Sequence, residues 1–252
     1  MNEGEAIFAV RDLHVKYGKF EAVKGVSFEL RRGEILGIVG ESGSGKSTIA
    51  KALMGLEKPG GGEIVRSCAT VQMIFQDAVG SLNPRMTVRQ TLSETIRRYA
   101  RLKGQRLEDR ISTLLAQVGL SEAVLEQYPR EMSGGQCQRI AIARALATGC
   151  DALVADEPVS ALDVSVQARV LNLLRDLRRE LGISILLIAH DLAVVKNVCD
   201  RVAVMEKGKF VDFGEAAEVF AHPASEYTRR LLSVVPDVRR ALEKRFGANA
   251  ET

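Results

Sequence analysis

A glycine-rich segment, Gly40 to Ser47, has the residue types and spacing of a loop that binds phosphate groups. It reads Gly-Glu-Ser-Gly-Ser-Gly-Lys-Ser, which fits the pattern G-x-x-x-x-G-K-[ST]. Its glycines let successive backbone N–H groups point at phosphate oxygens, and the start of the following helix adds partial positive charge. Lys46 would reach the β- and γ-phosphates of a nucleotide, and the Ser47 hydroxyl would be a ligand of Mg²⁺. The residues expected to bind nucleotide are Gly40, Ser42, Gly43, Ser44, Gly45, Lys46, Ser47 and Thr48.

Two adjacent acids, Asp156 and Glu157, follow an apolar run that is expected to be a strand. Open α/β sheets bind their ligands at the carboxyl ends of strands. Asp156 would hold Mg²⁺ through water, and Glu157 would polarise a water for in-line attack on the γ-phosphate. His190 ends another apolar run and would donate a hydrogen bond to the γ-phosphate. A solvated acid pair and a structural histidine are the alternatives, and the phosphate loop upstream favours catalysis.

The spacing of apolar residues predicts the elements that position these groups. An antiparallel pair is expected over 7–15 and 22–30, and further strands over 35–39, 71–75, 152–155, 183–189, 202–205 and 209–213. Helices are expected over 45–56, 136–147 and 164–181, with helical spacing from about 88 to 126 and two short helices near the end. The glycines at 60–62 are interpreted as a break. Strands that alternate with helices predict an α/β fold with a mostly parallel sheet.

Two of these helical segments carry a more specific expectation. The helix over 164–181 places one apolar face toward the core, made of Val170, Leu171, Leu174, Leu177 and Leu181. The densest basic run lies in the helical stretch and consists of Arg97, Arg98, Arg101, Lys103, Arg106 and Arg110. We interpret this run as a solvated helical face, with a phosphate-binding surface as the alternative.

The amino-acid composition limits the classes of function that the protein can have. The 252 residues are 46% hydrophobic and 27% charged, which is typical of globular proteins and excludes general disorder. A net charge of +3, with 5% aromatic residues and no Trp, gives no support for a nucleic-acid partner. The longest apolar stretches are strand-sized, whereas a membrane span needs about 20 residues. The polar start of the chain lacks the features of a signal peptide, so we expect a cytoplasmic protein.

The four cysteines are scattered and include no Cys-x-x-Cys pair. They are Cys68, Cys137, Cys150 and Cys199. In the cytoplasm they are expected to be reduced and to act as small hydrophobic side chains, the alternative being a metal or redox role.

The motifs of this chain stand in the order of the ATP-binding cassette (ABC) ATPases, which the sequence resembles from about residue 7 to 236. The matching segments are Gly40–Thr48, Gln76, Met132–Gln136, Ala155–Pro158, Ser160–Asp163 and His190. The resemblance implies a P-loop NTPase of RecA-like fold with an antiparallel β subdomain. It also implies a single ABC domain over 7–236, a helical subdomain inserted at about 82–150, and a C-terminal tail over 237–252.

The same resemblance implies ATP and Mg²⁺ as cofactors and a head-to-tail dimer. ATP would lie between the phosphate loop of one subunit and the 133–136 segment of the other. That segment, Ser133, Gly134, Gly135 and Gln136, would form a second anion site at a helix start. Gln76 would sense Mg²⁺ and the attacking water, and Asp163 would bridge the subunits. Tyr17 would stack on adenine, with a core position as the alternative.

Three further segments resemble those of the dipeptide, oligopeptide and nickel importers. They are Ser81–Val88, Ser160–Ala168, and a C-terminal motif that includes His222-Pro223, Tyr227-Thr228 and Pro236. In that group two ATPase chains, usually different, pair beneath two membrane permeases fed by an extracytoplasmic solute-binding protein. The implied function is ATP hydrolysis at the cytoplasmic face of the membrane, which powers uptake of peptides, nickel or a related small solute.

Alternatives from other classes are soluble ABC proteins that move no solute. The stretch between Gln76 and Ser133 is too short for the coiled coil of a repair ATPase, and translation factors usually carry two cassettes. A phosphonate-cleavage subunit remains as the alternative. A nucleotide-binding module without hydrolysis is disfavoured because Glu157 and His190 are both present.

The chain departs from the family pattern at three places. Only Glu63 to Thr70 separates the glycine run from the strand before Gln76, so a trimmed antiparallel subdomain is expected. Cys137 stands where Arg or Gln usually follows the signature, and we expect a buried or half-buried side chain there, not a redox switch. Ser225-Glu226 replaces a His-Pro repeat.

Overall fold

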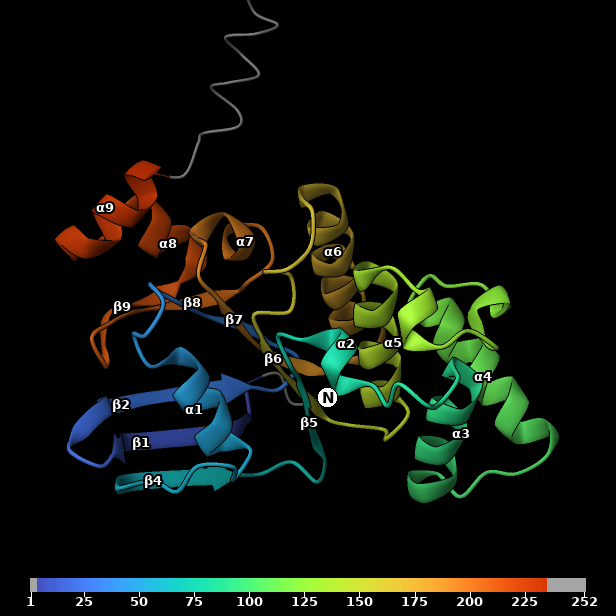
Figure 1. Cartoon of the computed structure of the whole chain (residues 1–252). Coiled ribbons are helices and arrows are strands. Elements are labelled where there is room, and N and C mark those ends of the chain that lie inside the picture. Colours follow the sequence, from blue (N-terminus) through green and yellow to red (C-terminus); the bar gives the residue numbers. More distant parts are fainter. Residues whose placement is uncertain (1–3, 235–252) are drawn as a thin grey trace, which may run out of the picture.

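The computed structural model describes residues 4–234 and shows two sheets with helices around them (Figure 1). The larger sheet has the order β5-β6-β7-β3-β8-β9, and the smaller has the order β2-β1-β4. The larger sheet contains β3 (Ile35–Val39), β5 (Val71–Ile74), β6 (Ala152–Asp156), β7 (Ser184–Ala189), β8 (Arg201–Glu206) and β9 (Lys209–Glu215). The smaller sheet contains β1 (Ala6–Tyr17), β2 (Phe20–Arg31) and β4 (Gly61–Arg66).

The helices surround the larger sheet and form a separate group at its β5 end. They are α1 (Lys46–Leu53), α2 (Ala78–Ser81), α3 (Val88–Tyr99), α4 (Gln105–Gln117), α5 (Gly134–Leu146), α6 (Val164–Leu181), α7 (Leu192–Lys196), α8 (Ala216–Ala221) and α9 (Glu226–Val234). Short 3₁₀ turns occupy Glu122–Val124 and Pro129–Glu131. In the part of the chain that the structure describes, none of the helices has the length and apolar character needed to cross a bilayer.

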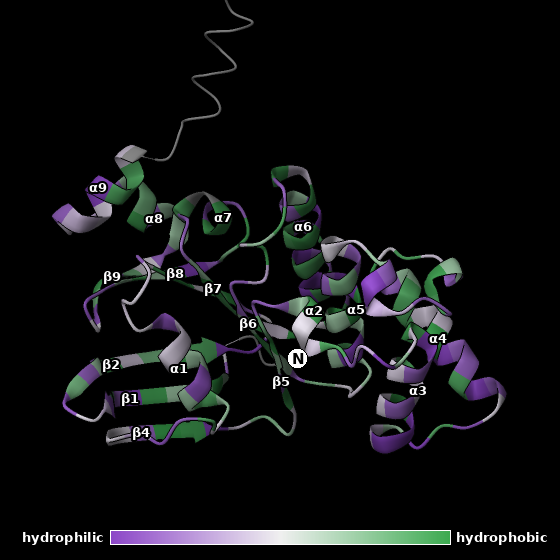
Figure 2. Cartoon of the chain, in the orientation of Figure 1, coloured by the Kyte–Doolittle hydropathy of each residue, from purple (hydrophilic) through white to green (hydrophobic). Residues whose placement is uncertain are grey.

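The larger sheet is parallel from β5 through β8, and only β8 and β9 pair antiparallel. Its central strands β3, β6 and β7 are buried along their whole length, and β6 and β7 are coloured as hydrophobic in Figure 2. Continuous apolar runs are expected for strands covered on both faces. Because β6, β7 and β3 are neighbours, their carboxyl ends meet at one edge of the sheet. The predicted α/β fold with a mostly parallel sheet is confirmed.

The smaller sheet differs from the prediction by one strand. The glycine run at 60–62 was expected to break the chain, but Gly61–Arg66 forms β4, which pairs with β1. A side chain at Gly62 would bring its Cβ within 2.1 Å of the Asp12 carbonyl oxygen, and Gly62 has φ +81°. Glycine therefore permits the close approach of the two backbones. The predicted break of the chain at 60–62 is therefore wrong, whereas the segment that follows is short, as predicted.

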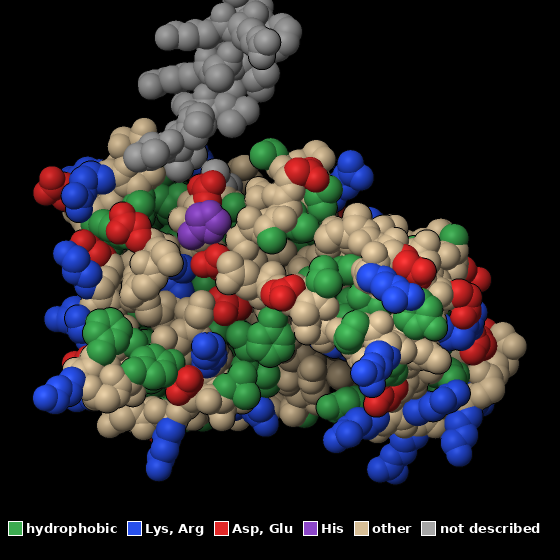
Figure 3. Space-filling model, in the orientation of Figure 1, with side chains coloured by type: hydrophobic (Ala, Val, Ile, Leu, Met, Phe, Trp, Pro, Cys, Tyr) green, Lys and Arg blue, Asp and Glu red, His purple; other side chains and the backbone are tan. Residues whose placement is uncertain are grey.

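The helical group α2 to α5 lies between β5 and β6 in sequence and on the right of Figure 1. Its interior is apolar and includes Leu92, Ile96, Ile111 and Leu114, all fully buried. The helical stretch predicted over 88–126 is divided, because Arg101 and Gly104 both have positive φ. The basic side chains of 97–106 are exposed, and basic residues gather over this region in Figure 3. The exposure of these side chains agrees with a solvated face. Arg110 departs from that prediction, because it is half-buried and donates to the Leu146 carbonyl oxygen.

The structure also tests the predicted helix over 164–181 and the predicted state of the cysteines. The helix over 164–181 is observed with those bounds, but Leu181, its last residue, is 42% exposed, so the predicted apolar face is buried only as far as Leu177. Helix α7 was not predicted. All four cysteines are free and buried, as expected, and the Cys137 thiol donates to the Pro129 carbonyl oxygen at 3.4 Å.

A glycine in the middle of β3 gives a test of the packing beneath the site. A Cβ at Gly37 would lie 2.9 Å from the Cys199 Sγ and 3.2 Å from the Val195 Cγ1. We expect Gly37→Ala to lower the free energy of unfolding by about 1–3 kcal/mol, the usual cost of overpacking, as measured by urea denaturation. Adding Cys199→Ala should recover part of the loss, since it removes the nearest atom. An unchanged urea midpoint in Gly37→Ala would contradict this packing.

Candidate functional site

The phosphate loop connects β3 to α1 and is held in shape by close backbone contacts. A Cβ at Gly40 would lie 2.1 Å from the Met205 carbonyl oxygen, and one at Gly45 would lie 2.4 Å from that of Ala22. Both residues have positive φ, +155° and +111°. Only glycine fits at these two positions, so the sequence pattern and the local geometry agree.

Lys46 is buried inside this loop. Its Nζ donates to the Gly40 carbonyl at 2.7 Å and to the Glu41 carbonyl at 2.9 Å. Burial lowers the pKa of Lys46, while the nearby carboxylates of Glu157 and Asp156 oppose the shift. The ammonium is therefore anchored at the floor of the loop, in a position to meet an anion that enters it.

The loop also contains a polar atom that suits a phosphate ligand. The Ser44 Oγ is buried and has no hydrogen-bond partner within residues 4–234. Buried hydroxyls are nearly always paired in folded proteins. A partner supplied by a bound phosphate satisfies this requirement, so the loop residues fit a nucleotide.

Ser47 and Asp156 meet at the ends of α1 and β6. The Ser47 Oγ donates to the Asp156 Oδ1 at 2.8 Å, although the two residues are far apart in sequence. Burial raises the pKa of the Asp156 carboxyl, and the hydrogen bond from Ser47 opposes that shift. Hydroxyl and carboxylate oxygens are the donors that Mg²⁺ prefers. This donor set fits the predicted magnesium site.

Glu157 lies beside the loop and is contacted by Gln76 and His190. The Gln76 Nε2 donates to the Glu157 Oε2 at 3.3 Å, and the His190 Nδ1 lies 3.6 Å from the same oxygen. Glu157 has φ +48°, a conformation that non-glycine residues rarely adopt and that is often found at functional sites. The structure thus brings together three of the residues predicted to be catalytic.

Ser160 joins this cluster, and its role was not predicted. Its Oγ donates to the Glu157 carbonyl at 3.1 Å and accepts from Gln76 Nε2 at 3.3 Å. A cavity of about 30 Å³ is lined by Glu157, Ser160, Gln167 and His190, among others, which is room for about one water molecule. The signal available in the sequence was the position of Ser160 three residues after the candidate base.

The segment from Ser133 to Gln136 begins α5 and forms a capping box. Ser133 Oγ accepts from the Gln136 N–H at 3.2 Å, and Gln136 Oε1 accepts from the Ser133 N–H at 2.8 Å. A Cβ at Gly135 would lie only 2.4 Å from the Val166 Cγ1 of α6. In the described part of the chain, no hydrogen bond joins this segment to the phosphate loop. Figure 1 shows α1, which follows the phosphate loop, and α5 on opposite sides of strands β5 and β6, so the two predicted anion sites lie apart within one chain.

Asp163 and Tyr17 are both exposed. Asp163 is the N-cap of α6 and accepts a hydrogen bond from the Val166 N–H at 3.0 Å. A hydrogen bond from Ser165 is the main cause that lowers the pKa of Asp163.

Tyr17 is 42% exposed, which rules out the core position. It pairs with Phe20 across the hairpin turn, and the same strand carries Ala22 against the phosphate loop. Tyr17 therefore stands on the same β1–β2 hairpin that touches the phosphate loop at Ala22.

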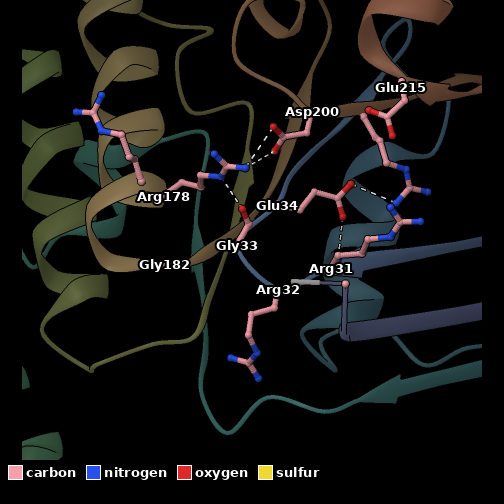
Figure 4. A pocket seen from close by; sticks show the side chains of 11 residues that line it. Arg31, Arg32, Gly33, Glu34, Arg178, Gly182, Asp200 and Glu215 are labelled. Carbon is pink, nitrogen blue, oxygen red and sulfur yellow. Dashed lines mark hydrogen bonds and ion pairs between the residues drawn. The ribbon is translucent and has the colours of Figure 1, made fainter. Parts of the chain in front are cut away.

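A larger cavity of about 740 Å³ lies at the opposite, amino-terminal edge of β3 (Figure 4). Arginine side chains line this cavity, and acidic side chains in the same lining neutralise part of their charge. Arg178 pairs with Asp200 at 3.3 Å, and Arg201 pairs with the buried Glu34 at 3.2 Å. It contains none of the predicted site residues, and its paired side chains connect the end of α6 to β3 and β8.

Comparison with known proteins places the chain among ABC transporter subunits. Residues 23–160 match the protein family described as ABC transporter. The chain is 48% identical over 234 residues to the oligopeptide transport ATP-binding protein OppF of Salmonella typhimurium, covering 86% of this chain and 70% of that protein. It is 42% identical over 255 residues to the probable D,D-dipeptide transport ATP-binding protein DdpF of Escherichia coli, covering 96% and 83%.

Solved structures agree with this fold. The cbiO1 subunit of Clostridium perfringens, part of the cbiONQ ABC transporter complex, superposes with a TM-score of 0.80 at 29% identity, covering 95% of this chain and 99% of that one. The ATP-binding cassette MJ0796, solved as a dimer in a post-hydrolysis state bound to ADP and Pi, gives a TM-score of 0.71 at 26% identity, covering 83% and 98%.

Proposed function

Because the chain belongs to the ABC transporter family of ATP-binding and ATP-hydrolysing subunits, we propose that it powers uptake of an oligopeptide or a related small solute, nickel included, through separate permease chains. The support is that its relatives are ATP-binding proteins of oligopeptide and dipeptide transport. These relatives support import over the phosphonate-cleavage alternative. The structural observation that carries hydrolysis is Glu157, held by Gln76 and His190 against a water-sized cavity.

The roles of the loop residues follow from their contacts. Lys46 and the loop amides bind the β- and γ-phosphates, and the Ser44 hydroxyl gains the partner that it lacks. Ser47, Asp156 and Gln76 would hold Mg²⁺, which when bound would neutralise charge on the phosphate oxygens. Glu157 accepts the proton of the attacking water. His190 donates to the γ-phosphate, and Tyr17 stacks on the adenine.

A head-to-tail dimer completes the site. The start of α5, with the Gly134 and Gly135 amides and the Ser133 hydroxyl, binds the γ-phosphate held by the partner's loop. This arrangement is supported by the separation of the two anion sites within one chain. Asp163 sits at the exposed start of α6, where it bridges the subunits. ATP that binds only the closed dimer drives closure, and hydrolysis releases it.

The other members of the complex are proposed from the same relatives. The partner ATPase is a second and different chain, as is usual in this group, or a copy of this one. Two permeases dock on the helical subdomain, about 82–150, and on the segment after Gln76, and an extracytoplasmic binding protein supplies solute. We place the single ABC domain at 7–236 on the cytoplasmic face of the membrane; residues 235 and 236 and the tail over 237–252 lie outside the described residues.

The test is to give the chain a short affinity tag in the organism that encodes it, and to purify it from membranes. Two permease chains should copurify, and in liposomes the ATPase rate should rise when the loaded binding protein is added with peptide or with nickel. The matched control is the same complex with Glu157→Gln, which should assemble without turnover. Recovery of the tagged chain only in a soluble complex would contradict transport.

A further inference from the structure

The C-terminal motif that begins at His222 has no role in the nucleotide chemistry described above, yet one of its side chains touches the phosphate loop. The Glu41 backbone N–H donates to the Tyr227 phenol oxygen at 3.1 Å, across 186 positions of sequence. Tyr227 is only 6% exposed and belongs to the main hydrophobic core. The ring of Tyr227 is therefore fixed by packing, while its hydroxyl reaches the loop.

Two side chains hold the same peptide group from opposite ends. The Gly40 carbonyl and the Glu41 N–H belong to one peptide unit. The carbonyl accepts from Lys46 Nζ at 2.7 Å, and the N–H donates to Tyr227. Because both ends are bonded, the unit that Lys46 contacts cannot rotate without breaking one of these hydrogen bonds.

The helix that carries Tyr227 is anchored to the sheet by a buried carboxylate. Asp212 of β9 accepts from the Ala224 N–H at 2.9 Å and the Ser225 N–H at 3.0 Å, and also from the Thr228 hydroxyl. Thr228 is fully buried and Asp212 is 8% exposed. Burial alone would raise the pKa of Asp212, but these hydrogen bonds outweigh it and hold the pKa below its ordinary value. The start of α9 is thus a rigid support.

We propose that Tyr227 is a positioning residue of the nucleotide site, and that Asp212 and α9 hold its phenol against the phosphate loop. The phenol keeps the Gly40–Glu41 peptide, and with it the Lys46 ammonium, in the orientation that receives phosphate. A loop already ordered loses less entropy when ATP binds. The inference rests on the proposed role of the phosphate loop. It gives the C-terminal motif, which does not itself contact nucleotide in the proposed site, a function in positioning that loop.

The test compares Tyr227→Phe, which removes only the hydroxyl, with Tyr99→Phe on the exposed end of α3. Loss of one hydrogen bond should raise the Kd for a non-hydrolysable ATP analogue with Mg²⁺ about 2- to 10-fold in Tyr227→Phe, as measured by calorimetry. The KM for ATP should rise by the same factor, with kcat at saturating ATP unchanged, because the phenol does not touch the reacting atoms. Tyr99→Phe should match the wild type. A lowered Tm with Kd and KM unchanged would show a merely structural role and overturn the proposal.

A second variant tests the support. Thr228→Val removes the hydroxyl that donates to Asp212 and should also raise the KM for ATP. The double variant Tyr227→Phe/Thr228→Val should show no higher KM for ATP than Tyr227→Phe alone, because the anchor acts through the phenol. If the increases in KM of the two single variants multiply in the double variant, Thr228 does not act through Tyr227 and this route is overturned. If Lys46→Ala binds nucleotide as the wild type does, the proposed site itself is wrong. If Lys46→Ala loses binding while Tyr227→Phe keeps it, only the present inference fails.

Discussion

Replacing Glu157 with glutamine should reduce the ATPase rate about 10²- to 10⁴-fold, the usual contribution of a general base, while ATP remains bound. Glutamine keeps the shape of the side chain and an acceptor oxygen for Gln76, which donates to Glu157 at 3.3 Å. It cannot take a proton from water. Because hydrolysis reopens the proposed dimer, the variant should accumulate as an ATP-bound dimer. The measurements are phosphate release and gel filtration with and without ATP.

The matched control for this variant is Glu218→Gln, which changes an exposed acid on α8 and should turn over ATP at the wild-type rate. Two results would contradict the role of Glu157. Wild-type turnover by Glu157→Gln would remove it as the base. Loss of nucleotide binding in the same variant would place Glu157 in binding and not in proton transfer.

The parts of the site that lie along one strand and its following loop were predictable from the sequence. Continuous apolar runs mark β3, β6 and β7 as buried strands. A residue with chemistry ends β6, namely Asp156, and another directly follows β3 and β7, namely Gly40 and His190. Parallel strands bring their carboxyl ends to one edge, so the meeting of these residues followed from the fold class. The capping box at Ser133 is likewise a local pattern.

Contacts between distant segments were not predictable in the same way. The spacing of residues along a chain records which face of an element they share, but not which element packs opposite. The Gln76 contact with Ser160 spans 84 positions, and the Tyr227 contact with Glu41 spans 186. Strand β4 was missed for a related reason, since glycine in the interior of a strand weakens it. Here Gly62 is required by the approach of β1, which a single segment does not reveal.

The other large effect is expected at Lys46. Replacement by alanine should raise the Kd for ATP about 10- to 150-fold, the loss expected for a hydrogen bond between charged groups. Calorimetry with a non-hydrolysable analogue measures this directly. Lys58→Ala, an exposed lysine in the segment after α1, is the control and should bind as the wild type does.

The fold should survive the loss of Lys46, which separates binding from stability. Burial lowers the pKa of Lys46, which means that keeping its ammonium charged in the folded protein costs free energy. Replacement by alanine removes this cost. The variant does leave the Gly40 and Glu41 carbonyls without the donor that they have now. These effects oppose each other, so the urea midpoint should change little while binding falls. Lys46→Met fills the same space without charge and should bind as poorly as alanine; nucleotide affinity near the wild type in Lys46→Met would make the role of Lys46 steric and refute the phosphate contact.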